Sequence, residues 1–151
     1  MKETKLKEST FELWRLIGRA NHSIFIHRQK ELRQHHIPVP QLWVLIAIKE
    51  LGANATLNDV AKAVERKPNV ISLQTTIMEK DGLIKRLKNT PKSTLLKLEL
   101  TEKGWETINA SRHSESVTKI FAALSAGERK QLEFVLQKLI AKAQKYHPTK
   151  S

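Results

Sequence analysis

Apolar residues recur at helical spacing in two segments near the ends of the chain. Within residues 8–34, one stripe contains Phe11, Leu13, Trp14, Leu16, Ile17, Ala20, Ile24 and Phe25. Near the other end, Ser125 and Glu128 have the spacing of a capping box, and a stripe follows with Leu132, Val135, Leu136, Leu139, Ile140 and Ala143. These patterns predict a long helix at each end. A further helix, capped by Thr101, is predicted over about residues 102–124.

The middle of the chain predicts three shorter helices. Residues 41–52 are apolar on nearly every side, which indicates a buried helix that ends at a glycine. A threonine suited to N-capping opens the segment 56–64. A proline suited to the first helical position opens the segment 68–81, which stops before Gly82.

Two short alternating segments then predict a β-hairpin. "LIKRLK" (residues 83–88) and "LLKLELT" (residues 95–101) alternate apolar and charged positions around the polar turn "NTPKST". The predicted fold is therefore mainly α with a small β-hairpin wing (α+β), a winged helix-turn-helix with long terminal helices. The apolar stripes of these terminal helices exceed what a small three-helix core can bury, so we expect them to be dimerisation helices packed across a two-fold axis.

The charge is concentrated in the segment that contains the predicted hairpin. The chain has a net charge of +12, and the segment from Lys62 to Lys97 holds nine basic and three acidic residues, half of that excess. Clustered positive charge favours a polyanionic partner such as nucleic acid. Two other readings remain open at this point: a small basic RNA-binding protein, and a helical interaction module without a nucleic-acid role.

A helix-turn-helix places the N-terminal part of its second helix in the major groove of double-stranded DNA. Here the segment 56–64 would brace the reading helix 68–81, and the basic wing 86–97 would extend the contact. The reading helix has two apolar rows. We expect Ile71 and Met78 to pack inward; the alternative buries Val70, Leu73 and Ile77. The candidate DNA contacts are Arg66, Lys67, Asn69, Ser72, Leu73, Thr76, Arg86, Lys88 and Lys92.

Other kinds of function find little support in the residues. Cysteine is absent, which excludes disulfides and thiolate metal sites. No glycine-rich phosphate loop or hydrolase motif occurs, so we expect no enzyme and no cofactor. His22 and His27 are five positions apart, not the three or four that share a helical face, and we expect no metal site. No apolar run is long enough to span a membrane, and we expect a soluble cytoplasmic protein.

The chain resembles the MarR family of bacterial transcription regulators. The resemblance rests on "MEKDGLIKR" and "LELTEKG" at their observed separation, with "PVPQLWVLIAI" similar to the family's second helix. It covers nearly the whole chain as a single subunit. Residues of about 40–100 would form a winged-helix DNA-binding lobe, and residues of about 8–34 and 102–147 a helical dimerisation lobe. The wing departs from the family, because "PKST" stands where an Asp-x-Arg group is common. Leu73 also departs, because many relatives have a polar or basic residue there.

The resemblance implies a homodimer that binds a pseudo-palindromic operator, usually as a repressor released by an effector. Small aromatic acids or phenols are effectors of relatives. Trp14, Trp43 and Trp105 lie on apolar helical faces and could line such a cavity, but we expect them to be core residues. We expect His113 to lie in a polar dimer seam rather than in a ligand pocket.

Overall fold

The structure is a computed structural model that describes residues 1–146, apart from the side chain of residue 2. Position 147 of the predicted dimerisation lobe lies outside the described residues. In chain order the elements are α1 (Lys2–Leu32), η1 (Arg33–His35), α2 (Val39–Leu51), η2 (Gly52–Asn54), α3 (Leu57–Ala63), α4 (Pro68–Lys80), β1 (Ile84–Lys88), β2 (Leu96–Leu100), α5 (Glu102–Arg112), α6 (Glu115–Phe121) and α7 (Ala126–Gln144).

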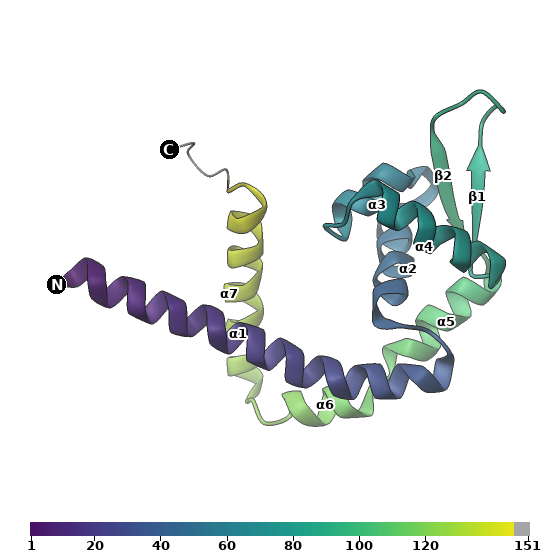
Figure 1. The fold of residues 1–151 in the computed structure, drawn as a ribbon. Coiled ribbons are helices and arrows are strands. Elements are labelled where there is room, and N and C mark those ends of the chain that lie inside the picture. Colours follow the sequence, from purple (N-terminus) through teal and green to yellow (C-terminus); the bar gives the residue numbers. More distant parts are fainter. Residues whose placement is uncertain (147–151) are drawn as a thin grey trace. The chain divides into compact units, whose positions relative to one another are not determined.

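The chain divides into two compact units. Unit 1 spans Met1–Ser114 and contains α1 to α5 with the hairpin of β1 and β2 (Figure 1). Unit 2 spans Glu115–Ser151, and its described elements are α6 and α7. The predicted class, mainly helical with a two-stranded wing, is confirmed.

Helix α2 is the centre of the core of unit 1. It packs against α3, β2 and α5, and its apolar character on nearly every side follows from these neighbours. The residues of α2 that are buried are Val39, Leu42, Val44, Leu45, Ala47 and Ile48. The core continues into α4 and the strands through Ile71, Met78, Ile84 and Leu98.

The wing is anchored at its base. Strands β1 and β2 are antiparallel, with Ile84 opposite Leu100 and Lys88 opposite Leu96. The Leu98 backbone N–H donates to the Ala55 carbonyl at 2.8 Å, so β2 also pairs with the segment that enters α3. Leu98 is 1% exposed, and its burial fixes the inner face of the hairpin toward the core.

Hydrogen bonds and close packing join the start of α5 to the turn that follows α4. The Thr101 hydroxyl donates to the Gly82 carbonyl at 2.6 Å and accepts from the Gly104 N–H, which confirms the predicted cap. A Cβ at Gly104 would lie 2.2 Å from the Leu83 carbonyl oxygen, closer than any side chain tolerates. These contacts explain physically why "DGLI" and "LTEKG" occur together in this chain.

Most predicted helix boundaries are confirmed. Thr56 and Ser125 cap α3 and α7 with their side chains, and Ser125 forms the predicted capping box with Glu128. Gly52 and Gly82 have φ angles of 73° and 76°, as expected for residues that end helices. Helix α1 begins earlier than predicted and ends at Leu32.

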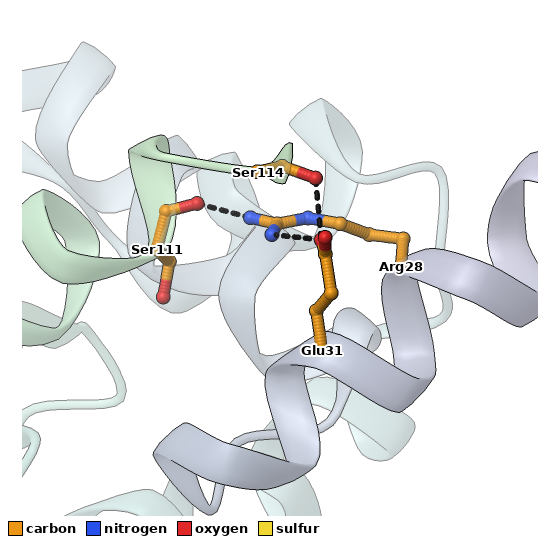
Figure 2. Close-up of polar contacts among 4 residues, drawn as sticks. All are labelled: Arg28, Glu31, Ser111 and Ser114. Atoms are coloured by element: carbon orange, nitrogen blue, oxygen red, sulfur yellow. Dashed lines mark hydrogen bonds and ion pairs between the residues drawn. The ribbon is translucent and has the colours of Figure 1, made fainter. Parts of the chain in front are cut away.

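The prediction of one helix over residues 102–124 is wrong. Helix α5 ends at Arg112, and His113 has extended backbone angles (φ −87°, ψ 95°) before α6 begins. The cause lies on α1 (Figure 2). Arg28 donates to the Ser111 carbonyl, which a continuous helix would use for its own hydrogen bond, and the Ser114 hydroxyl donates to the Glu31 carboxylate at 2.5 Å. Arg28 and Glu31 are also an ion pair at 3.3 Å.

The expectation that the three tryptophans are core residues is also wrong. Trp14 is 69% exposed, Trp43 56% and Trp105 44%. The Lys49 ammonium lies over the ring of Trp105, 5.6 Å from the ring centroid, in a cation–π contact. The ring of Trp14 contacts the ring of Phe11. The apolar stripe on α1 that contains Trp14 is exposed along much of its length, because no other element of unit 1 covers it within the described residues.

Candidate nucleic-acid interface

Helix α4 turns one face into the core and the opposite face outward. Ile71, Thr75 and Met78 are buried, whereas Leu73 is 72% exposed. The predicted packing side of the reading helix is therefore confirmed, and the alternative that buries Val70, Leu73 and Ile77 is wrong. Asn69 and Thr76 are exposed and Ser72 is half-buried.

The N-terminus of α4 projects from a tight turn after α3. Glu65 has a left-handed φ of 53°, and the Arg66 N–H donates to the Ala61 carbonyl at 2.9 Å to close the turn. Within the described residues no side chain caps α4, and its first turn has no acidic residue. Pro68 has no N–H and the Val70 N–H donates to the Lys67 carbonyl, so of the first three residues only Asn69 has an N–H left for an anion. The helix dipole adds a partial positive charge at this end. Arg66 and Lys67 are both exposed there.

The other end of α4 turns directly into the wing. The Leu83 N–H donates to the Met78 carbonyl and the Gly82 N–H to the Glu79 carbonyl, each at 2.9 Å. This pattern is a Schellman motif, which the left-handed conformation of Gly82 makes accessible. The reading helix and β1 are thus joined by a short and well-defined connection, as Figure 1 shows.

The side chain of Arg86 on β1 forms hydrogen bonds with α4. Its Nη1 donates to Thr76 Oγ1 at 2.6 Å, and its Nη2 donates to Ser72 Oγ at 3.2 Å. Its backbone N–H donates to the Glu79 carboxylate at 2.6 Å. Three of the predicted DNA contacts, Ser72, Thr76 and Arg86, are therefore bonded to one another. The half-buried guanidinium holds the wing against the reading helix.

The other two predicted DNA contacts on the wing face solvent. Lys88 is exposed at the end of β1, and Lys92 is exposed in the turn between the strands. Arg86 and Lys88 also line a pocket of about 280 Å³, together with residues of α3, the hairpin and Ser72. This pocket combines two positive charges with hydroxyl groups, so the chemistry it favours is that of an anionic oxygen.

Sequence reasoning missed part of the outward face of α4. Val70 is 46% exposed and Ile77 54%, and at their spacing they flank Leu73 in one row. The signal was present in the sequence as the second apolar row, from which only Leu73 was chosen. Near the C-terminal end of the helix, the exposed Lys80 and Lys85 are offset by the exposed acids Glu79 and Asp81.

Residues 1–146 contain neither a cluster suited to a metal ion nor a membrane-spanning helix. The described residues contain no group of three or more His, Asp or Glu side chains placed to hold a metal ion. Among the helices in this range, none has the length and apolar character needed to cross a membrane.

Sequence comparison finds a bacterial repressor. No protein-family model matches the chain. The chain is 25% identical over 118 residues to the HTH-type transcriptional repressor MdtR of Bacillus subtilis, a match that covers 76% of this chain and 75% of that protein.

Structure comparison finds many proteins with the same fold. The organohalide-sensing transcriptional regulator RdhR, in its 2,4-dichlorophenol-bound form, matches with a TM-score of 0.78 and 24% identity over 94% of this chain and 90% of that chain. A mutant MarR from Escherichia coli in complex with operator DNA matches with a TM-score of 0.76 and 21% identity, over 87% and 95% of the two chains. The Staphylococcus aureus MepR–DNA complex matches with a TM-score of 0.69 and 24% identity, over 87% and 96%. The chain therefore has the fold that these regulators share.

Proposed function

We propose that this chain is a transcriptional regulator of the MarR family, a homodimeric repressor that binds a pseudo-palindromic operator in double-stranded DNA. The observation that carries the proposal is the exposed face of α4, with Leu73 outward and exposed basic residues at the N-terminus of the helix and on the adjacent wing. An α-helix fits the major groove, where each base pair has its own pattern of donors, acceptors and methyl groups.

Phosphate contacts supply the affinity in this proposal. Arg66 and Lys67 flank the open N-terminal turn of α4, and Lys88 and Lys92 are exposed on the wing. Contacts of this kind release counterions, so binding should weaken steeply as salt rises. Arg86 has a different role from these four residues, because its side chain already has partners on α4.

A dimer accounts for the apolar surface that each unit exposes. In unit 1, α1 exposes Phe11, Leu13, Trp14, Leu16 and Ile17. In unit 2, α7 exposes Leu132, Phe134, Val135, Leu139 and Ile140. Several large apolar side chains exposed on one helix are typical of an association site. We assign residues of about 40–100 to the DNA-binding lobe and residues of about 8–34 and 102–147 to the dimerisation lobe.

A small aromatic effector fits the same proposal. RdhR was solved with 2,4-dichlorophenol, a phenol, and this chain exposes Trp14, Trp43 and Trp105 rather than burying them in its core. Exposed indole rings offer apolar area and an N–H donor to an aromatic ligand. The protein acts without catalysis and works in the cytoplasm, where genomic DNA is bound.

Selection of bound duplexes tests the proposal. A random duplex library would be selected with the full chain at physiological salt, and one selected duplex would be footprinted. We expect two protected half-sites whose centres are one helical turn apart, about 10–10.5 base pairs, or a small multiple of that spacing. Light scattering in solution should give twice the 17.3 kDa mass of one chain.

Competition experiments separate this function from the alternative ones. A structured RNA that displaces the selected duplex at equal concentration would contradict the proposal and favour an RNA-binding protein. Failure to bind any duplex at low salt would contradict it too, and would favour a helical interaction module.

A further inference from the structure

We infer that α4 recognises thymine through its C5-methyl group, with Leu73 as the central contact and Val70 and Ile77 beside it. The inference rests on the proposed function and names the base that the reading helix selects. Leu73 is the most exposed of the three at 72%, with Val70 at 46% and Ile77 at 54%. Residues spaced by three and four positions form one ridge on a helix, so the three side chains make a continuous apolar strip.

The polar groups beside this strip are already in use. Thr76 Oγ1 donates to the Ser72 carbonyl at 2.9 Å and accepts from Arg86 Nη1, while Ser72 Oγ accepts from Arg86 Nη2. The Thr76 hydroxyl therefore has both a donor and an acceptor partner, and the Ser72 hydroxyl is half-buried and already accepts from Arg86, so both are less available to bases than an unbonded side chain. Among the side chains of α4 predicted to read bases, the Asn69 amide and the Leu73 side chain are left, and within the described residues the Asn69 side chain makes no hydrogen bond.

The charges around the strip select DNA as its occupant. Arg66 and Lys67 are exposed at the N-terminal end of α4, and Lys88 and Lys92 are exposed on the adjacent wing. At the C-terminal end, Lys80 and Lys85 are offset by Glu79 and Asp81. A strip of exposed aliphatic side chains needs an apolar partner, and the surrounding cations need a polyanionic one. In the major groove of DNA the exposed apolar group is the C5-methyl of thymine, which lies between two rows of phosphates.

The position of Asn69 supports the same base pair. Asn69 lies one helical turn before Leu73, on the same outward face of α4. An asparagine amide pairs in a bidentate manner with N6 and N7 of adenine. Neighbouring A·T pairs would therefore satisfy both residues: the amide on adenine and the leucine on the methyl group of thymine. We expect A·T pairs at the centre of each half-site.

Deoxyuridine substitution is the direct test, because uracil keeps the hydrogen-bonding groups of thymine and lacks only the methyl group. Each thymine of one selected half-site would be replaced singly, and affinity would be measured by fluorescence anisotropy. We expect one or two positions at which deoxyuridine lowers the affinity of the wild-type chain. The loss there should be about fourfold, the effect of removing one methyl group from an apolar contact. The other positions should change by less than the error of the measurement.

Two variants connect the methyl group to its reader. Leu73→Ala should bind the thymine duplex less tightly and show no further loss on the sensitive deoxyuridine duplex. Because Leu73 is largely exposed, this change should not unfold the chain. Leu51→Ala is the matched control: Leu51 is 42% exposed at the end of α2, outside the reading helix, and this variant should keep the fourfold sensitivity.

The outcomes distinguish the inference from the proposed function. Tight, salt-sensitive binding of a selected duplex with no deoxyuridine effect at any position would overturn the methyl contact and leave the DNA-binding function intact. A deoxyuridine effect of equal size in wild type and Leu73→Ala would also overturn it. The absence of any duplex binding would instead contradict the proposed function.

Discussion

The Nη1 atom of Arg86 donates a hydrogen bond to Thr76 Oγ1 at 2.6 Å, which joins β1 to the reading helix α4. The bond comes with a second, at 3.2 Å, to Ser72 Oγ, one turn earlier on the same helix. The Arg86 side chain therefore adds two bonds between the wing and α4 to the short connection through Gly82. This arrangement gives Arg86 a positioning role in addition to its charge.

Replacing Arg86 should affect both stability and DNA binding. In Arg86→Ala, Thr76 and Ser72 lose the guanidinium as a hydrogen-bond donor. We expect the free energy of unfolding to fall by about 1 kcal/mol, because partial exposure to solvent lowers the contribution of a charged hydrogen bond to stability. The affinity for a selected duplex should fall as well. Urea denaturation and anisotropy measure the two effects.

Lys88→Ala is the matched control for Arg86. Lys88 is exposed two residues further along β1, and its removal should leave the free energy of unfolding unchanged within about 0.5 kcal/mol. An Arg86→Ala variant as stable as Lys88→Ala would show that the bonds to α4 contribute nothing to holding the wing.

The wing lysines should act through phosphates. Lys88→Ala and Lys92→Ala should each weaken binding to all duplexes alike and lower the slope of log affinity against log salt by about one. A titration from 50 to 300 mM salt, with a selected and a scrambled duplex, measures both quantities. A change in the ratio of the two affinities would mean that the lysine reads bases, contrary to this assignment.

Gly104 should tolerate no side chain. A Cβ there would lie 2.2 Å from the Leu83 carbonyl oxygen, and the nearest atoms include backbone that the Thr101 cap holds in place. We expect Gly104→Ala to lower the free energy of unfolding by about 2 kcal/mol or more, because close packing leaves no room to relax. Thermal and urea unfolding would measure the loss.

Gly127 provides the matched control on another helix. The nearest atom to a Cβ at Gly127 would be Ser125 Oγ at 3.9 Å, an ordinary contact. Alanine has a higher helix propensity than glycine, so Gly127→Ala should be neutral or more stable by up to about 1 kcal/mol. Equal losses in the two variants would contradict the close packing described for Gly104.

Local chemistry made the caps, the hairpin and the phase of α4 predictable from the sequence. The side chains of Thr56, Thr101 and Ser125 cap helices by accepting from backbone N–H groups only three residues away. Of the two apolar rows of α4, the one that contains Met78 lies next to the turn at Gly82, which favours it as the packed row. The break after Arg112 could not be predicted, because its cause is on α1, 83 residues earlier in the chain.

The same distinction applies to the candidate site. Helical periodicity allowed two outward faces of α4, and the one that exposes Asn69 and Leu73 was preferred from the position of Met78 before the turn and in part from the family resemblance. The bonds of Arg86 to Ser72 and Thr76 depend on how the hairpin packs on α4, which no local pattern encodes. The exposure of Trp14 was missed because an apolar stripe looks the same whether its own subunit or a second copy covers it.

The polar contacts around Arg28 should contribute more than an exposed ion pair of the same kind. Arg28 and Glu31 are 17% and 26% exposed, and they hold the Ser111 carbonyl and the Ser114 hydroxyl at the end of α5. Arg28→Ala removes a charged donor from a largely desolvated group, so we expect a loss of about 2 kcal/mol in the free energy of unfolding.

Arg15 is the control for Arg28, because it forms an ion pair with Glu12 on the same helix at the same spacing but with side chains 45% and 55% exposed. Arg15→Ala should cost no more than about 0.5 kcal/mol. Urea unfolding of the two variants at equal protein concentration compares them. Equal losses would mean that the contacts at the end of α5 are no stronger than a surface ion pair.

The exposed stripe on α1 gives a prediction for assembly. A charge placed in an apolar dimer interface loses its hydration without gaining an ion-pair partner. The desolvation free energy of such a charge exceeds the binding free energy that one apolar side chain contributes there. We therefore expect Ile17→Asp, at a residue 44% exposed in the single chain, to shift the mass measured by light scattering from two chains toward one. Its affinity for a full operator should fall toward that for a half-site, because one DNA-binding lobe is lost.

Ile77→Asp is the matched control on the reading helix. Ile77 is 54% exposed on α4, and an aspartate there should repel phosphate and weaken DNA binding while the mass stays that of two chains. A lower mass in Ile17→Asp alone, with DNA affinity reduced in both variants, would separate the two surfaces. If Ile17→Asp remained a dimer with full operator affinity, α1 would not form the interface, and another surface would have to cover its apolar stripe.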